Sequence, residues 1–481
     1  MPRTIFKEVS FGDTTIETEF PERTRILQPP EPLPPLENPE QAIRDALAFP
    51  IDHEPLSKSV GPRSKVTIAF DDPCMPMIPM KPPDFREMAI TILLEELDKL
   101  GVSKHNIRLI CANALHRKWT RKELTTILGS KIIQSFGLSQ LYCHDAEDPE
   151  SLIYLGETER GFEVEVNRAV IESDLFIYVN VTNSAMNGGW KSIVVGLSSF
   201  RSIRHHHRPF PGASGKSVMD HKRSSFQKLL GEMGKLVDAE LDKRGRRILT
   251  LESVLNTAQP SELIAVFAGH PAKTHEETLK IVDKQQVISV QGQSDVVVYG
   301  LSNQMDHYSK LSTINPILVR NLGLSYSFGL YQNKPLVREG GILILAHPCP
   351  RVFHPLHQPS YEKLFEEVLP HLRDPYEVWD VYSEDYAHRP EFIHKYRYAY
   401  AYHGVHPLIL WGQGAFALRH LSRVFLAGAT DSEAAQRLGF EPITSIEEAI
   451  QEAENTLGKD CSITYQPMPP FYIPKVEVET V

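Results

Sequence analysis

Short apolar runs alternate with amphipathic stretches along most of this chain. From residue 65 onwards the pattern predicts strands at 66–70, 106–112, 140–144 and 175–181, separated by helices at 84–100, 120–128 and 165–171. Strands that alternate with helices in this order pair as parallel sheets. The first part of the chain is therefore predicted to form an α/β domain.

A second α/β pattern follows. Strand 263–267 and helix 276–283 lead into strands 296–299, 341–346 and 424–426, with helices near 307–319, 361–369 and 390–398. We predict an α/β fold with two domains, mainly parallel sheets and an active-site cleft between the domains. The first domain is expected to hold residues 1–280, joined by the C-terminal segment 420–481, and the second to hold residues 285–415. A long helix at 445–456 and an extended tail should pack back onto one of them.

Three further segments differ from this alternation. Residues 4–27 read as a β-hairpin around Gly12 and Asp13, and the proline-rich residues 29–39 as an extended surface connector. Residues 208–245 contain a helix rich in lysine and arginine. We expect this segment to be an exposed excursion with a solvated surface helix.

Composition and charge narrow the class of partner. The chain has 481 residues, of which 41% are hydrophobic, so it can bury a large core. Its formal net charge of -10 gives no general attraction to nucleic acid or to an anionic membrane. No apolar stretch reaches about 18 residues, the length that predicts a membrane span, and the N-terminus lacks the apolar run of a signal peptide. A small soluble ligand is the expected partner.

The cysteines point to a reducing compartment. Their number is odd, and no two are separated by only two residues, so neither a disulfide framework nor a structural zinc site is indicated. A cytoplasmic location fits this usage. The five positions are Cys74, Cys111, Cys143, Cys349 and Cys461.

Polar loops follow three of the predicted strands. They are residues 71–74 (DDPC), 113–116 (NALH) and 183–207, which end in the triple histidine. In a parallel α/β sheet, ligands bind beyond the carboxyl ends of the strands. We therefore expect the three loops to converge on one site.

The loop after strand 175–181 contains two glycines, a tryptophan and a lysine, Lys191. A glycine pair that opens a helix leaves backbone N–H groups uncovered, and Gly188 and Gly189 would suit an anionic group such as a phosphate. A phosphate-binding loop of nucleotide hydrolases needs glycine directly before the lysine, but this chain has Trp190 there. The hydrolase alternative is therefore disfavoured.

The triple histidine suggests metal binding, but helix geometry limits it. Neighbouring residues on a helix point about 100° apart, so at most one of His205, His206 and His207 can face a given ion. A straight helix would place Lys191 and His207 roughly 24 Å apart, at about 1.5 Å per residue. If both serve one site, the chain must bend. Gly196, Ser198 and Ser199 allow this, with Ser199 as the N-cap of a short helix at 200–206.

Several separated motifs are similar to one known family. Residues 113–120 (NALHRKWT) with Glu123 resemble its "GTHR..T..E" loop, and residues 188–192 (GGWKS) its "SGG.K" loop. Tyr299 and Lys310 fall in a segment similar to "YP…YQ..K", and residues 154–161 and 166–168 match a middle stretch. On these motifs the chain resembles the LarA-type nickel-dependent lactate racemases and their 2-hydroxyacid racemase and epimerase relatives, over roughly residues 60–430.

The resemblance implies roles for particular residues. His116 takes the place of an acid/base catalyst, and Lys191 that of the lysine that carries the cofactor covalently. A histidine sixteen residues after this lysine binds nickel in the family, and the same spacing selects His207. Lys310 resembles the lysine that meets the substrate anion. Asp71 matches the family's aspartate, and we expect it beside the cofactor.

Three departures from the family pattern change the expected chemistry. The family's substrate-binding arginine is replaced by Cys74, so carboxylate recognition must differ. The family's second catalytic histidine is missing, because residues 182–184 are Thr, Asn and Ser. The family's glutamine near the lysine is replaced by His307, which we consider as the missing base.

The resemblance implies a mechanism of reversible hydride transfer. Hydride leaves the 2-hydroxyacid for a nickel-pincer nucleotide, a pyridinium dithiocarboxylic acid mononucleotide, and a flat 2-ketoacid takes it back on either face. We therefore predict a nickel-dependent racemase or epimerase that relies on cofactor-biosynthesis enzymes. Loss of the arginine and the extra polar groups favour a sugar acid over lactate. The alternative is a homologue that binds the cofactor or an organic acid without turning it over. The sequence does not indicate an oligomeric state.

Overall fold

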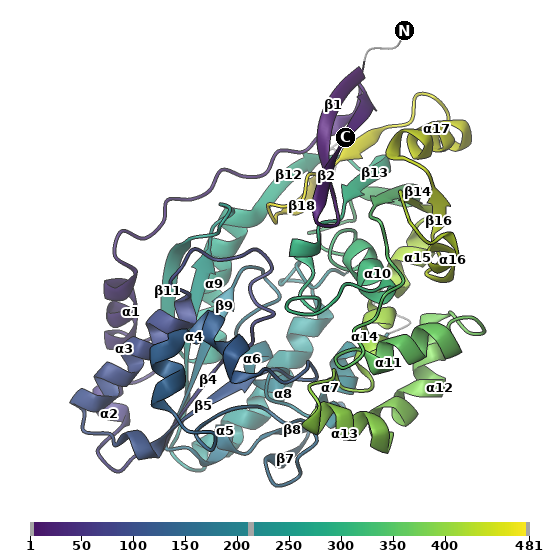
Figure 1. Cartoon of the computed structure of the whole chain (residues 1–481). Helices are drawn as coiled ribbons and strands as arrows, with labels where there is room; N and C mark the ends of the chain where they lie inside the picture. Colours follow the sequence, from purple (N-terminus) through teal and green to yellow (C-terminus); the bar gives the residue numbers. More distant parts are fainter. Residues whose placement is uncertain (1–3, 210–215, 478–481) are drawn as a thin grey trace.

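Two six-stranded sheets organise the protein (Figure 1). The computed structural model describes residues 4–209 and 216–477. The first sheet has the order β11-β10-β9-β4-β5-β6, and only β11 runs antiparallel to its neighbour. Its strands are β4 (Val66–Asp71), β5 (Ile107–Ala112), β6 (Leu141–Cys143), β9 (Leu175–Thr182), β10 (Ile248–Leu255) and β11 (Leu263–Gly269).

The second sheet is parallel throughout and has the order β16-β15-β14-β13-β17-β3. Its strands are β3 (Arg25–Ile26), β13 (Ser294–Gly300), β14 (Val337–Ala346), β15 (Arg423–Ala427), β16 (Glu441–Ile443) and β17 (Ile463–Tyr465). The predicted α/β class with mainly parallel sheets is thus confirmed. The central strands β4 and β9 are buried at every residue, as expected for parallel strands covered on both faces.

Helices and short strand pairs complete the two sheets. The longer helices are α1 (Pro39–Ala48), α3 (Phe85–Lys99), α4 (Arg121–Ser135), α8 (Ser225–Asp242), α9 (Pro271–Gln286), α12 (Pro375–His388) and α17 (Ile446–Leu457). The shorter ones are α2 (Leu56–Ser59), α5 (Ala169–Glu172), α6 (Trp190–Val194), α7 (Phe200–His207), α10 (Pro316–Leu324), α11 (Pro359–Lys363), α13 (Pro390–Tyr398), α14 (His406–Gln413), α15 (Ala415–His420) and α16 (Ser432–Arg437). Outside the two sheets lie the pairs β1 (Thr4–Phe11) with β2 (Thr14–Pro21), β7 (Leu152–Glu157) with β8 (Glu163–Asn167), and β12 (Val287–Gln291) with β18 (Ile473–Glu477).

Both ends of the chain belong with the second sheet. The predicted hairpin around Gly12 and Asp13 is confirmed as β1 and β2, but β3 then pairs with β17. Strands β15, β16 and β17 also pair in this sheet, whereas we expected segment 420–481 to join the N-terminal domain. Apolar residues of β15 lie in register with those of β14, so the second sheet buries them. We therefore propose one domain of residues 39–286 and another built from residues 4–27 and 294–477.

Two predicted helical segments differ in the structure. Residues 163–167 form β8, because the alternation of buried Val164 and Val166 with Glu163 and Glu165 has the period of a strand. A single helical turn, α5, follows. Residues 307–315 are irregular, and α10 starts only at Pro316, where the Asn315 side chain caps the first turn.

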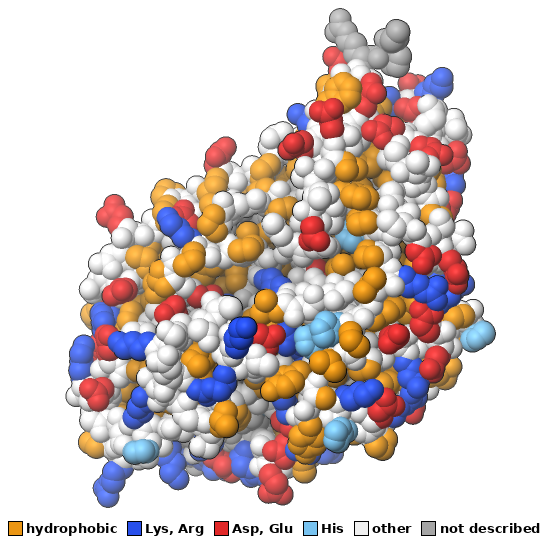
Figure 2. Space-filling view, viewed as in Figure 1, with side chains coloured by type: hydrophobic (Ala, Val, Ile, Leu, Met, Phe, Trp, Pro, Cys, Tyr) orange, Lys and Arg blue, Asp and Glu red, His pale blue; other side chains and the backbone are white. Residues whose placement is uncertain are grey.

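The segment after the triple histidine is not a solvated excursion. Helix α8 buries one face, and its Gly234 packs so closely on Trp190 that an added Cβ would lie 2.2 Å from the ring. Residues 210–215 of this segment lie outside the described residues. Acidic and basic side chains are interspersed over the face of the molecule in Figure 2. In the described ranges no helix has the length and apolar character to cross a membrane.

Candidate active site

A cavity of about 970 Å³ is lined by loops from both sheets. The first sheet contributes the segments after β4, β5 and β9, and the second contributes residues after β13 and at the end of α14. Strands β4 and β9 are neighbours in the sheet. The chain continues from β4 to β5 and β6 on one side of this pair, and from β9 to β10 and β11 on the other. This reversal is the topological switch point at which open α/β sheets bind ligands.

Asp71 is buried at the end of β4. Its carboxylate accepts hydrogen bonds from Tyr178 Oη at 2.9 Å, Asn180 Nδ2 at 2.9 Å and the Val181 backbone N–H at 2.7 Å. Burial nevertheless raises the pKa of Asp71 to about 6. Asp71 therefore joins β4 to β9 and lines the cavity.

Asp72 points the other way and pairs with His116. The distance from His116 Nδ1 to Asp72 Oδ2 is 2.8 Å, and Trp119 Nε1 donates to the same oxygen at 3.2 Å. Burial opposes the charged form of Asp72, but the adjacent His116 and these hydrogen bonds lower its pKa. An ionised Asp72 holds the proton of His116 on Nδ1 and leaves Nε2 as the basic nitrogen. The His116 side chain keeps 24% of its surface exposed, against 3% for Asp72.

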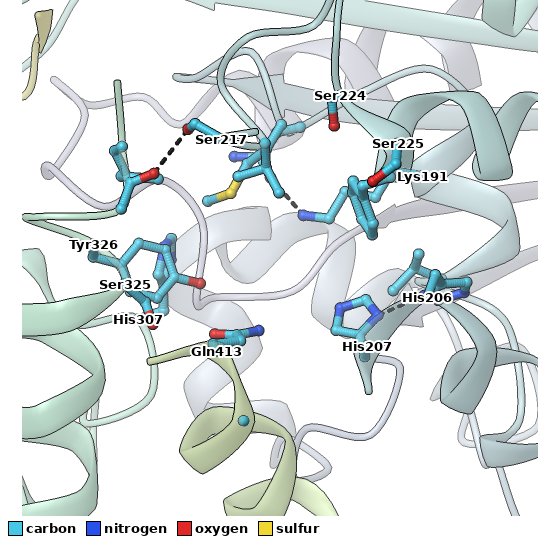
Figure 3. A pocket seen from close by; sticks show the side chains of 18 of the residues that line it. Lys191, His206, His207, Ser217, Ser224, Ser225, His307, Ser325, Tyr326 and Gln413 are labelled. Atoms are coloured by element: carbon cyan, nitrogen blue, oxygen red, sulfur yellow. Dashed lines mark hydrogen bonds between the residues drawn. The ribbon is translucent and has the colours of Figure 1, made fainter. Parts of the chain in front are cut away.

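Lys191 lies at the start of α6 and faces the cavity (Figure 3). Its ammonium group donates to Asn187 Oδ1 at 2.7 Å. Burial lowers the pKa of Lys191, although the charges of Asp71 and Asp72 oppose this shift. A buried amine with a lowered pKa is a better nucleophile than a surface lysine.

The glycine pair before Lys191 is held by a buried carboxylate. Gly188 and Gly189 have φ values of 105° and 56°, a region that favours glycine. The Gly189 N–H donates to Glu252 Oε1 at 2.6 Å, and Glu252 Oε2 lies 3.0 Å from His275 Nδ1. The Gly189 amide, which we expected to be available to a phosphate, is therefore already engaged. Such a role stays a proposal for Gly188.

The triple histidine divides between two sides of α7. His205 lies 3.5 Å from Glu163, whereas His206 and His207 line the cavity, with their Nδ1 atoms 2.5 Å apart. Burial lowers the pKa of His206 to about 3 and that of His207 well below its usual value. Both imidazoles are therefore neutral, the form that ligates metals. Helices α6 and α7 are separate, which provides the expected bend between Lys191 and His207.

The predicted N-cap of α7 has another role. The Ser199 side chain makes no capping hydrogen bond and contacts the carboxylate of Glu165 instead. Because Glu165 lies on β8, this contact ties the start of α7 to the hairpin that the sequence did not predict.

His307 and Lys310 follow β13 on the second sheet. His307 Nδ1 lies 3.2 Å from the Cys74 carbonyl oxygen, so Nδ1 carries the proton and the unpartnered Nε2 is an acceptor. Burial lowers the pKa of His307 to about 3. Lys310 donates to the Pro76 carbonyl and is not among the residues that line the cavity. Burial lowers the pKa of Lys310 to about 8.

Sequence reasoning missed Asp72, Trp119 and His406. His406 begins α14, and its ring lies edge-on to that of His116, with centroids 5.3 Å apart. Tyr308 packs against the same His116 ring at 5.2 Å. Asp72 stood next to Asp71 in the sequence, but nothing in the pattern of residues indicated which of the two faces His116.

One cluster of potential metal ligands stands out in residues 4–209 and 216–477. Ligand atoms of Asp72, Cys74 and His116 lie within 4.8 Å of one another. The hydrogen bond between His116 and Asp72 accounts for this proximity, and burial raises the pKa of the Cys74 thiol well above its usual value. We therefore interpret the cluster as the hydrogen-bonded pair of His116 and Asp72 beside the neutral thiol of Cys74.

Comparisons with known proteins agree with the α/β fold. A family model described as the lactate racemase N-terminal domain matches residues 11–218. Lactate racemase from Thermoanaerobacterium thermosaccharolyticum is 21% identical over 319 residues, which cover 64% of this chain and 66% of that protein. The apoprotein structure of the lactate racemase from that organism aligns with a TM-score of 0.70 at 18% identity, over 98% of this chain and 100% of the other. A Thermotoga maritima protein gives a TM-score of 0.57 at 15% identity, over 91% and 98%.

The fold is an α/β fold like that of the lactate racemase apoprotein, and the cavity lies at the carboxyl end of the first sheet. Within that class, residues 11–218 match the lactate racemase N-terminal domain, and the chain is similar to a lactate racemase.

Proposed function

We propose that this protein is an isomerase that racemises or epimerises a 2-hydroxyacid. One observation carries the proposal: the pair of His116 and Asp72 lines the same cavity as Lys191 and His207. This cavity therefore combines an acid/base histidine, a buried amine and a neutral imidazole, the groups that the family's reaction requires. The similarity to a lactate racemase supports the reaction class.

The residues present fit the nickel-pincer nucleotide. Lys191 would carry it through an amide-type bond, and His207 would offer its neutral imidazole to nickel. When bound, the group would supply the site that accepts hydride from the substrate carbon that carries the hydroxyl. Cofactor-biosynthesis enzymes would then be partners of this protein. Asp71 would support the floor of the site through β9, rather than contact the substrate.

His116 would take the hydroxyl proton as the hydrogen leaves the adjacent carbon. Asp72 keeps Nδ1 protonated and stabilises the imidazolium that forms when Nε2 accepts the proton. A positioned base of this kind contributes on the order of 10²–10⁴-fold in rate.

His307 is our proposal for the second proton carrier. Figure 3 shows His307 and Tyr326 across the cavity from Lys191 and His207. His116 follows β5 of the first sheet, whereas His307 follows β13 of the second. The unpartnered Nε2 of His307 is an acceptor that a substrate hydroxyl would satisfy. Its pKa of about 3 makes it a weaker base than an ordinary histidine, so we assign it to orientation and proton return.

A polar substrate is favoured over lactate. Cys74 is neutral and cannot replace the family's arginine, so Lys310 would hold the carboxylate as a point charge after leaving the Pro76 carbonyl. The cavity is also lined by hydroxyl and amide groups that suit a polyhydroxylated chain. They belong to Ser225, Ser325, Tyr326 and Gln413.

The test is a panel of optically pure 2-hydroxyacids, from lactate to sugar acids, offered to protein co-expressed with cofactor-making enzymes. We expect loss of optical rotation with at least one acid, and retention of deuterium placed at carbon 2, because hydride returns to the carbon from which it came. His116→Gln should abolish the reaction, and His388→Gln, at an exposed position, should not. No reaction across the panel would contradict the proposal and favour binding without turnover.

A further inference from the structure

Cys111 and Cys143 face each other on neighbouring strands of the first sheet. They are paired in register between β5 and β6, so their side chains are neighbours on one face of the sheet. Registered residues of adjacent strands point to the same face and lie about 4.8 Å apart. Neither thiol takes part in the proposed racemase reaction.

Cys143 is the more reactive thiol of the pair. It is half-buried, whereas Cys111 is buried. The Trp119 backbone N–H donates to the Cys143 sulfur at 3.2 Å. The interaction with the neighbouring Cys111 thiol lowers the pKa of Cys143 against the effect of burial, and the Trp119 N–H and the charge of Lys118 lower it further. Burial raises the pKa of the thiols of Cys74 and Cys349, so they should react more slowly.

We propose that Cys143 is an oxidation site that forms a reversible disulfide with Cys111. The Cys143 thiolate attacks the terminal oxygen of a hydroperoxide, the O–O bond breaks, the alkoxide leaves (hydroxide in the case of hydrogen peroxide), and Cys143 becomes a sulfenic acid. The Cys111 thiol then attacks the Cys143 sulfur, the S–O bond breaks, and water leaves as the S–S bond forms. Two electrons pass from the sulfurs to the hydroperoxide, and each of the two steps balances.

The sheet geometry permits this bridge and makes it easy to reduce. A separation of about 4.8 Å lies within the usual Cα range of disulfides, about 4.4–6.8 Å, but exceeds the usual Cβ range of about 3.5–4.5 Å, so the two strands must move closer. Strand β6 can approach Cys111, because it has three residues and forms the edge of the sheet. Strained bridges have high reduction potentials and are typical of regulatory disulfides.

The thiol pair is connected to His116 through one tryptophan. The Trp119 backbone N–H binds the Cys143 sulfur, and its indole Nε1 binds Asp72 Oδ2, which also holds His116. Oxidation draws the Cys143 sulfur towards Cys111 and weakens its bond with Trp119. The oxidised state would therefore disturb the Asp72–His116 pair. Only this last consequence for activity rests on the proposed function.

The test uses the full chain without cofactor, treated with hydrogen peroxide and analysed by peptide mass spectrometry. We expect loss of two hydrogen atoms and a linked pair of peptides that contain Cys111 and Cys143, both reversed by dithiothreitol. Cys111→Ser should leave a sulfenic acid at Cys143 that dimedone traps, and Cys143→Ser should protect Cys111. Cys461→Ser is the matched control and should oxidise like the wild type. Equal loss of all five thiols, or no Cys111–Cys143 link, would overturn the proposal.

A second readout tests the connection to His116. The rate at which diethyl pyrocarbonate modifies His116, followed by mass spectrometry, should change several-fold between the reduced and oxidised wild-type protein. In Cys143→Ser, treatment with peroxide should leave the rate of His116 modification unchanged. An unchanged rate would overturn the coupling even if the disulfide forms. Because neither readout needs substrate or cofactor, their outcome is independent of the proposed racemase reaction.

Discussion

Two adjacent carboxyl groups at the end of β4 have opposite electrostatic environments. Asp71 is buried between β4 and β9, and its pKa rises to about 6, whereas the pKa of Asp72 is lowered beside His116. Neighbouring groups whose environments separate their pKa values commonly divide structural and catalytic roles. Asp72 is therefore the residue that we expect to control the basicity of His116.

Asp72→Asn tests this assignment. The amide removes the negative charge that stabilises the His116 imidazolium and presents either a donor or an acceptor to Nδ1. We expect kcat to fall on the order of 10²–10⁴-fold, the contribution of a well-placed acid/base group. The pH profile of kcat/KM should shift as well. Asp71→Asn serves as the comparison, and an equal fall in kcat without a change in pH profile for both variants would contradict a special role for Asp72.

Lys310 should give the enzyme an alkaline limit. Burial lowers its pKa to about 8, so the ammonium loses its proton, and with it the attraction for a carboxylate, as the pH rises through that value. KM should increase above about pH 8, whereas kcat should change less. Lys310→Arg keeps its charge to much higher pH, so its KM should stay level. A wild-type KM that is constant through this range would argue against contact between Lys310 and the substrate.

For single residues, the sequence predicted which side chains line the cavity better than it predicted their hydrogen-bond partners. His116, Lys191 and His207 were predicted from the resemblance to the racemase family, and all three line one cavity. Adjacent residues at a strand end point in opposite directions, and the sequence alone did not define the last residue of β4. It therefore could not show whether Asp71 or Asp72 is the partner of His116. The engagement of the Gly189 N–H by Glu252 could not be predicted either, since β10 was not recognised.

Among the elements, the turn between β9 and α6 depends on its glycines. An added Cβ at Gly188 would lie 2.6 Å from His275 Nδ1 and 2.9 Å from Glu252 Oε2. Its φ of 105° also disfavours any residue with a side chain.

Gly188→Ala should therefore destabilise the protein by more than backbone strain alone, which costs of order 1–3 kcal/mol. Gly156→Ala is the matched control, because Gly156 has a φ of 114° but no atom within 4 Å of an added Cβ. The free energy of unfolding in urea would measure both. Equal losses for the two variants would show that the Glu252–His275 contact does not constrain the turn.

Helices and strands whose apolar residues follow one clear period were predicted well. Those whose structure depends on contacts with distant parts of the chain were not. Strands β4 and β9 are continuous apolar runs and were recognised. The helix predicted at 165–171 overlaps the end of β8, because a five-residue strand with charged residues at alternate positions is too short for a decisive period. Helix α8 was expected to be solvated, but its apolar stripe packs on α6 beside the cavity.

Over the whole molecule, contacts from helix α13 and the loop after it, in the domain of the second sheet, hold the His116 loop. Tyr396 Oη donates to the Ala114 carbonyl at 3.1 Å and accepts from the Ala146 N–H at 3.0 Å. The His403 backbone N–H donates to the Leu115 carbonyl at 3.1 Å. The position of His116 therefore depends on how the two sheets are joined.

Tyr396→Phe removes only the hydroxyl group from this junction. It leaves the Ala146 N–H and the Ala114 carbonyl without their buried partner, at a cost of about 1–3 kcal/mol for each unsatisfied group. We expect faster hydrogen exchange at residues 113–116 and a lower kcat. Tyr398→Phe, at a position that is 65% exposed, is the control. If exchange in the loop is the same in both variants, the second sheet does not hold it.

The arrangement of the two domains was the least predictable feature. Both chain ends join the second sheet, and strand partners far apart in sequence, such as β3 and β17, leave no local signal in the residues that form them. The alternation of strands and helices therefore predicted the α/β class but not which sheet receives segment 420–481.

The most direct test of the central claim is the intact mass and nickel content of the protein co-expressed with cofactor-making enzymes. We expect a covalent mass increase with bound nickel in the wild type and in Lys235→Ala, an exposed position on α8. Both should be lost in Lys191→Ala, and nickel should be lost in His207→Ala. A wild-type protein with no Lys191-dependent mass increase and no nickel would contradict the claim that this cavity holds the cofactor of a 2-hydroxyacid racemase.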